Sequence, residues 1–225
     1  MKLFTNLSSS PLIFSLVILA LYGSCKKHDP DLVVKGETKV KMVNAVQTES
    51  NQNIFVDGEK ISTAALAFSE STNYLKIYSG SRNVKFMGEN NTQTEFSLSY
   101  TPSITYTTFL VSDRSGVREI ISYEDNLSNT ETGKAKIKLI NLSPYFSTGL
   151  NVSVQAGTQF VNGLLYKEAS SYFSVEAGLN LRYNVVGSAT VKTIDGTSLL
   201  AGKIYTIWFS GISAGTLEAH VITDN

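Results

Sequence analysis

The chain has 225 residues, with 19 basic and 19 acidic side chains, two histidines and one cysteine. A formal net charge of zero excludes the strongly basic class of nucleic-acid-binding proteins, and a single cysteine excludes an intramolecular disulfide or a cysteine zinc cluster. With 42% hydrophobic and 17% charged residues, the chain is apolar enough to build a globular core.

The first 24 residues have the pattern of a secretory signal peptide. Lys2 precedes an apolar run from Leu12 to Tyr22 that is interrupted only by Ser15, and the small residues Gly23-Ser24 follow the run. A basic start, an apolar stretch of about 7–15 residues and small residues define such a signal, whereas a membrane-spanning helix needs about 20. The sequence therefore predicts an exported protein from which residues 1–24 are removed.

Cys25, the only cysteine, follows this signal directly. The arrangement resembles a bacterial lipoprotein signal peptide, with Tyr22 at a position where that family prefers leucine. The resemblance implies a diacylglycerol on the sulfur of Cys25, cleavage before this residue and anchorage in a membrane. The alternative is an ordinary signal peptide followed by a chance cysteine.

The polar segment after the cysteine is predicted to be a tether. It contains Pro30 and Gly36 and has no sustained periodicity, so residues 25–37 are interpreted as the lipidated cysteine and its flexible linker. His28 lies in this segment. We expect it to be a solvated linker residue rather than a metal ligand, because metal sites need three or four fixed ligands.

The rest of the chain repeats one pattern in the same order, at an offset of roughly 97–99 residues. The matching pairs are Val40–Ala45 with Ile137–Leu142, Gly58 with Gly157, Tyr74 with Tyr172, Gly80 with Gly178, and Tyr106 with Tyr205. We predict two homologous domains, 38–124 and 134–225, joined by the polar linker 125–133.

Each copy is predicted to consist of short strands. Segments rich in valine, isoleucine, threonine and aromatic residues are separated by turn pairs such as Asp57-Gly58 and Ser115-Gly116, and no helical period is sustained. Such spacing favours a β-sandwich or a barrel. Tyr106 and Tyr205 each open a late apolar strand, where immunoglobulin-like sandwiches place a tyrosine that hydrogen-bonds to the backbone. Asn44 and Asn141 end the first strand of each copy and are expected to cap local backbone.

These motifs resemble domain of unknown function family 4397. They are the segment apolar-Lys-apolar-Val/Ile-Asn, the strand that closes on Asp57-Gly58, then Tyr74 with Gly80, and a Tyr-Thr strand. The resemblance implies tandem immunoglobulin-like β-sandwiches in an extracytoplasmic, often lipid-anchored protein. It brings no catalytic residues.

No constellation in the sequence indicates an enzyme, a cofactor or a metal. His220 is the only histidine outside the tether and is expected on a surface strand, and no phosphate-binding glycine loop is present. Residues 211–215 have the spacing G-x-S-x-G, but no helical period follows them, as the strand-to-helix turn of a hydrolase elbow requires. The scattered carboxylates are interpreted as solvated surface charge, and they are Glu89, Glu95, Asp113, Glu119 and Glu124.

Aromatic side chains are the remaining candidates for ligand contact. Trp208 alternates with Tyr205, Ile207 and Phe209 and is therefore expected to face outward or toward the other domain, while Tyr145 and Phe146 follow Pro144 in a loop. The candidate contacts are thus Trp208, Tyr145 and Phe146.

The sequence predicts a non-enzymatic binding or structural protein, lipid-anchored in the bacterial envelope and facing the periplasm or the cell surface. Its expected partners are the membrane, through the lipid, and a glycan or protein ligand, but not nucleic acid. Two alternatives stay open: a surface carbohydrate-binding lipoprotein, and a subunit of a surface fibre or adhesin whose C-terminal strand pairs with a neighbour.

Overall fold

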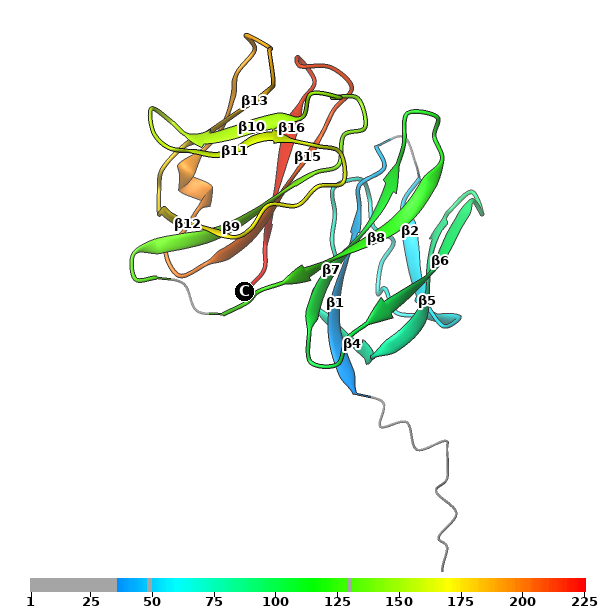
Figure 1. Cartoon of the computed structure of the whole chain (residues 1–225). Coiled ribbons are helices and arrows are strands. Elements are labelled where there is room, and N and C mark those ends of the chain that lie inside the picture. Colours follow the sequence, from blue (N-terminus) through cyan, green and yellow to red (C-terminus); the bar gives the residue numbers. More distant parts are fainter. Residues whose placement is uncertain (1–35, 48–49, 129–130) are drawn as a thin grey trace, which may run out of the picture. The chain divides into compact units, whose positions relative to one another are not determined.

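The fold was analysed in a computed structural model that describes residues 36–47, 50–128 and 131–225 (Figure 1). The strands of these ranges form four four-stranded sheets, and the one helical element among the described residues is the short 3-10 turn Gly196–Ser198. The prediction of an all-β sandwich fold is confirmed. Across the described ranges, no helix is long and apolar enough to cross a membrane. The predicted signal peptide, Cys25 and nearly all of the tether lie outside the described residues.

The first eight strands form one sandwich. β4, β1, β7 and β8 make one sheet, in that order, and β3, β2, β5 and β6 make the other. We call the first the inner sheet, because it faces the other sandwich, and the second the outer sheet. The strands are β1 (Glu37–Asn44), β2 (Gln52–Val56), β3 (Glu59–Lys60), β4 (Leu75–Tyr78), β5 (Gly80–Gly88), β6 (Gln93–Tyr100), β7 (Thr105–Ser112) and β8 (Arg118–Asp125).

The next eight strands repeat this arrangement. β12, β9, β15 and β16 make the second inner sheet, and β11, β10, β13 and β14 make the second outer sheet. The strands are β9 (Lys134–Asn141), β10 (Leu150–Val154), β11 (Gln159–Leu164), β12 (Phe173–Glu176), β13 (Leu181–Val185), β14 (Lys192–Ile194), β15 (Ile204–Ser210) and β16 (Glu218–Thr223).

Both sandwiches share one unusual pairing. The first strand runs parallel to the seventh, as β1 with β7 and β9 with β15, while the other strand pairs are antiparallel. Constant-type immunoglobulin domains instead group strands one, two, four and five in one sheet. The likeness to immunoglobulin domains therefore extends to the two-sheet architecture and not to the order of the strands.

Alternating apolar side chains fill the two sandwich cores. In the first sandwich Val40, Met42 and Tyr106 point from the inner sheet toward Phe86 and its neighbours in the outer sheet. In the second sandwich the equivalent alternation fills a separate core, to which Ile137, Leu139, Val152, Tyr183 and Phe209 contribute.

A third core lies between the two inner sheets. The inner strands bury both of their faces: all seven residues of β15 are buried, and so are six of the eight in β7. Along each inner strand, the residues between those of the sandwich core point to the opposite face and meet here. These side chains are Val43, Phe109, Val111, Ile140, Leu142, Trp208 and Ile222. A strand buried on both faces needs a nearly continuous apolar sequence, which explains why these segments show little polar alternation.

Two ion pairs cross this junction in opposite directions. Lys41 of β1 pairs with Asp224 just after β16 at 2.8 Å, and Lys138 of β9 pairs with Asp125 at the end of β8 at 2.5 Å. The lysines and aspartates occupy matching positions in the two repeats, so the contact is reciprocal, as in a two-fold symmetric dimer. All four side chains are almost fully buried.

Neighbouring hydroxyl groups complete this buried polar cluster. Thr107 donates to Asp125 at 2.7 Å and Thr206 donates to Asp224 at 2.8 Å, again at matching positions. The hydroxyl of Tyr74 lies 2.9 Å from Asp125 and 3.3 Å from Asp224. Asp125, assigned from sequence to the linker, is therefore the last residue of β8 and part of the junction.

The two asparagines cap local backbone as expected, because Asn44 accepts from the N–H of Val46 at 3.1 Å and Asn141 from that of Ser143 at 2.9 Å. They also shape the junction. Asn44 donates through Nδ2 to the carbonyl of Leu66 at 3.1 Å, and Asn141 donates to Leu164 at 2.9 Å. Each holds a loop containing a residue with positive φ, Ser69 at 67° or Lys167 at 65°. These loops carry an aromatic side chain into the junction, so the repeated asparagine supports the contact between the sandwiches.

The predicted tyrosine corners are also present. The hydroxyl of Tyr106 accepts a hydrogen bond from the backbone N–H of Thr101 at 3.1 Å, and that of Tyr205 accepts from Leu200 at 2.9 Å. Each bond spans five residues. Both tyrosines thus fix the loop that enters the seventh strand of their sandwich.

The crossed ion pairs make a stability prediction. Lys138→Met leaves the buried carboxylate of Asp125 without its cation, so the free energy of unfolding should fall by about 3–5 kcal/mol in urea titrations. Adding Asp125→Asn to this variant should recover part of the loss, because it removes the uncompensated charge.

The matched control is an ion pair of the same type at the surface. Lys76 and Glu37 are 3.4 Å apart and largely exposed, so Lys76→Met should cost less than about 1 kcal/mol. Equal losses for Lys76→Met and Lys138→Met would show that burial of the junction pair contributes nothing.

Candidate functional site

A cleft lies where loops of both sandwiches meet at one end of the junction. We call it the junction cleft; its volume is about 380 Å³, within the range of roughly 300–1,000 Å³ for small-molecule sites. Its lining residues come from both repeats and are Ala45, Gln47, Ser112, Asp113, Arg114, Ser115, Gly116, Leu142, Ser143, Pro144, Tyr145, Ser210, Gly211 and Ile212.

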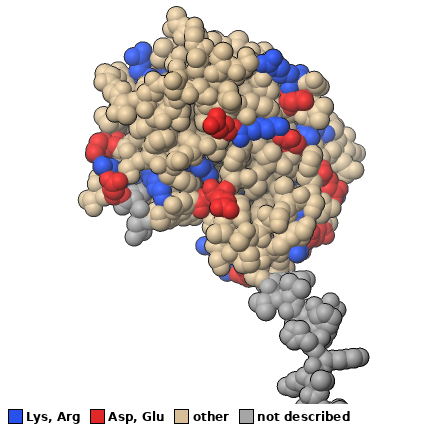
Figure 2. All heavy atoms as spheres, viewed as in Figure 1, with Lys and Arg blue, Asp and Glu red and all other residues tan. Residues whose placement is uncertain are grey.

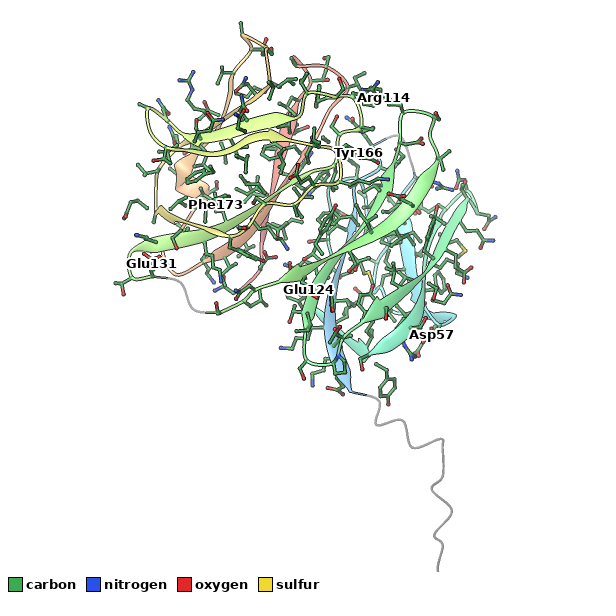
Figure 3. All side chains as sticks on the ribbon, in the orientation of Figure 1. Asp57, Arg114, Glu124, Glu131, Tyr166 and Phe173 are labelled. Atoms are coloured by element: carbon green, nitrogen blue, oxygen red, sulfur yellow. The ribbon has the colours of Figure 1, made fainter. Side chains whose placement is uncertain are left out.

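The first wall of the cleft is the turn between β7 and β8. The N–H of Gly116, with φ at 80°, donates to the carbonyl of Asp113 at 3.1 Å. The Oδ1 atom of Asp113 accepts from the N–H groups of Ser115 at 2.8 Å and Val117 at 2.9 Å. These bonds fix the turn that presents Arg114. Figure 3 labels this residue and Tyr166 of the second sandwich, whose hydroxyl donates to the carbonyl of Ser112 at 3.1 Å.

The second wall is the loop after β9, which carries Tyr145. The side chain of Asn141 accepts from the N–H of Ser143 at 2.9 Å, and the hydroxyl of Ser143 lies 2.5 Å from the carbonyl of Gly211. The N–H of Tyr145 in turn donates to that hydroxyl at 3.3 Å. A chain of hydrogen bonds thus connects the end of β9 to the backbone of Tyr145.

Gly211 is required where these loops meet. Its φ is 124°, and a Cβ atom there would lie 2.6 Å from the carbonyl oxygen of Thr216. Any other residue would therefore displace the backbone that closes the floor of the cleft.

Arg114 and Tyr145 form an exposed pair at the cleft. The Nε atom of Arg114 donates to the carbonyl of Pro144 at 2.6 Å, and its guanidinium carbon lies 5.8 Å from the centre of the Tyr145 ring. Tyr145 is 41% exposed. Within the described residues, the Nη atoms of Arg114 have no hydrogen-bond partner. The pair therefore offers a fixed ring and free donors to a ligand.

The structure removes two of the three predicted contact residues from this role. Trp208 is 0% exposed and packs edge-on against Phe68 and Phe109 in the junction core. Phe146 is 6% exposed and belongs to the core of the second sandwich. Neither ring offers a face to a ligand in solvent. Tyr145 alone keeps the predicted position in an exposed loop.

His220 is not the surface residue expected from the sequence. It lies on β16, which faces the first sandwich, and its ring stacks on Trp208 with centroids 4.0 Å apart. Phe68 packs edge-on against it at 5.2 Å, and its Nε2 atom lies 2.8 Å from the hydroxyl of Ser210. Burial lowers the pKa of His220, and the charge of Glu218 acts in the opposite direction.

The groups of the buried polar cluster at the junction are engaged with one another. Burial and the neighbouring carboxylates of Asp125 and Asp224 raise the pKa of Tyr74 far above its usual value. The phenol therefore stays protonated and donates. In the described ranges, no group of three or more histidine, cysteine, aspartate or glutamate residues could hold a metal ion.

Sequence reasoning missed Arg114 and the four charged residues of the junction. Arg114 was part of a predicted turn, but nothing in that turn indicates that Pro144 and Tyr145 lie beside it. The lysine–aspartate pairs did leave a signal, because Lys41 and Lys138 match within the repeat, as do Asp125 and Asp224. A charge repeated on an otherwise apolar strand indicates a buried partner.

The fold and this cleft define a tandem β-sandwich protein with a cleft lined by loops of both sandwiches. Residues 38–148 match the model of DUF4397, a domain of unknown function, which is the family that the sequence motifs predicted. The match begins in β1 and ends just after Tyr145, in the loop that follows β9. A comparison with curated proteins returns no match.

The His220 environment predicts a pH-dependent junction. Because burial lowers its pKa below the usual 6.5, the unfolded chain binds the proton more readily than the folded one. The free energy of unfolding should therefore fall as the pH drops below about 6.5. Trp208, the only tryptophan, reports this through its fluorescence.

His220→Gln is the matched variant, because it keeps a polar partner for Ser210 but does not titrate. Its stability should change less than that of the unmodified chain between about pH 7.5 and 5.5. Identical pH profiles for both proteins would contradict the assigned role of His220.

Proposed function

We propose that this chain is a lipid-anchored binding protein of the bacterial envelope that holds its ligand in the junction cleft. The observation that carries the proposal is the exposed Arg114–Tyr145 pair in a cleft to which both sandwiches contribute. Binding residues are commonly placed on loops that a rigid scaffold positions. Here that scaffold is a pair of sandwiches joined by a third core.

Rigidity of the junction supports a binding role. The walls of the cleft belong to different sandwiches, so any rotation between the sandwiches would separate Arg114 from Tyr145. The junction core and the two crossed ion pairs oppose such a rotation. A cleft whose shape is fixed before binding loses less conformational entropy when the ligand enters.

The polar groups at the cleft are better suited to recognise the ligand than an electrostatic field over the whole surface. On the face drawn in Figure 2, basic and acidic side chains are interspersed and most of the surface is neither. Selectivity would then depend on the few polar groups at the cleft, as in most small-molecule sites.

The fibre-subunit alternative has one supporting observation. β16 is the last strand of the chain and an edge of its sheet, so its outer side could pair with a strand of another molecule. However, the residue that follows this strand, Asp224, is held by Lys41. Exchange of the strand would therefore break a buried ion pair, and only pairing along its free edge is open to this alternative. We favour the binding role because both sandwiches contribute residues to the cleft.

The proposed lipid anchor predicts where the variant Cys25→Ala is found in the cell. Cys25→Ala removes the sulfur that would carry the lipid, so the protein should move from the membrane fraction to the soluble extracytoplasmic fraction. Membrane fractionation with immunoblotting measures this. Ser24→Ala is the control, because it keeps both the cysteine and a small residue before it. Continued membrane association of Cys25→Ala would refute the anchor.

A further inference from the structure

The polar groups of the junction cleft have a definite chemical pattern. Arg114 offers the donors of its Nη atoms, and the neighbouring Asp113 offers Oδ2, which accepts no hydrogen bond within the described residues. The first is a donor only, and the second, when ionised, is an acceptor only. Because the two charges are opposite and adjacent, they attract neither an anion nor a cation strongly.

A hydroxyl group is the ligand group that matches such a pair, because it donates and accepts at once. The aromatic ring beside the pair suits a ligand that also has an apolar face. Arg114 lies over one side of the Tyr145 ring, so the 41% exposure of this side chain leaves other parts of the ring accessible. Ile212, 63% exposed, adds apolar surface to the same lining.

We propose that the junction cleft binds a neutral saccharide, with Tyr145 against an apolar sugar face and Arg114 and Asp113 hydrogen-bonding to sugar hydroxyls. The inference rests on the proposed binding function and names its ligand class. The volume of about 380 Å³ suits a short saccharide unit rather than a folded protein surface. The fixed turn and loop hold the three side chains before the sugar arrives.

The second repeat provides an internal comparison. At the positions of Asp113 and Arg114 it has Ile212 and Ser213, and at the position of Tyr145 the first repeat has Thr48. Each repeat therefore contributes a different part of the cleft: the first the charged turn, the second the aromatic ring. A single repeat lacks the complete site.

The test uses the full chain in a detergent without a sugar headgroup, which would otherwise compete for the cleft. Cellobiose, maltose, lactose and the disaccharide of N-acetylglucosamine are titrated by saturation-transfer NMR and calorimetry. At least one should bind, and Tyr145→Ala and Arg114→Gln should each weaken it by about tenfold or more.

Two exposed residues outside the cleft supply controls of the same type. Tyr78→Ala and Arg182→Gln should bind the sugar as the unmodified chain does. Unchanged Trp208 emission in every variant shows that the junction stays folded, and Tyr145→Phe, which keeps the ring, should retain most of the affinity.

Two results would overturn the inference. They are no binding of any of these sugars up to about 10 mM, and binding that Tyr145→Ala and Arg114→Gln leave intact. Neither of these results bears on the release of Cys25→Ala from the membrane. The proposal on the ligand class and the proposal on the anchor can therefore be refuted independently.

Discussion

The structure depends on the burial of both faces of the inner sheets. One face of each fills its own sandwich, and the other fills the junction core, so neither sandwich can leave the other without exposing Trp208, Phe109 and their neighbours. Apolar contact alone tolerates small rotations and slips. The crossed pairs of Lys41 with Asp224 and Lys138 with Asp125 do not, because a shifted junction would leave buried charges unpaired.

The repeated sequence motif can now be given a physical meaning. In the segment apolar-Lys-apolar-Val/Ile-Asn, the apolar residues alternate between sandwich core and junction core, and the lysine crosses to the other sandwich. The asparagine holds the loop that carries Phe68 or Tyr166 into the junction, where Phe68 packs on Trp208 and the Tyr166 hydroxyl donates to Ser112 at 3.1 Å. The motif therefore describes a self-complementary surface, satisfied here by two copies within one chain.

Much of the fold could be read from the sequence, because its signals are local. Turn pairs, alternating strands and the offset between repeats predicted two β-sandwiches, and Tyr106 and Asn44 fulfil their expected backbone roles. The candidate site was harder to predict. Alternation places Trp208 on the outer face of its sheet correctly, but only the packing of the other sandwich shows that this face is buried. His220 was misassigned for the same reason, and Arg114 needs a neighbour from the other repeat.

The two repeats are alike at the junction and differ at the cleft. Residues that build the junction, such as the two lysines and the two asparagines, are the same in both copies, whereas the loops around the cleft differ. The turn Asp113–Gly116 is charged, and its counterpart, which begins at Ile212, is not. A symmetric junction thus supports an asymmetric cleft. Because changes in the loops do not disturb the buried contacts, this scaffold can change its ligand without losing its fold, and the cleft is where the function of this chain is best sought.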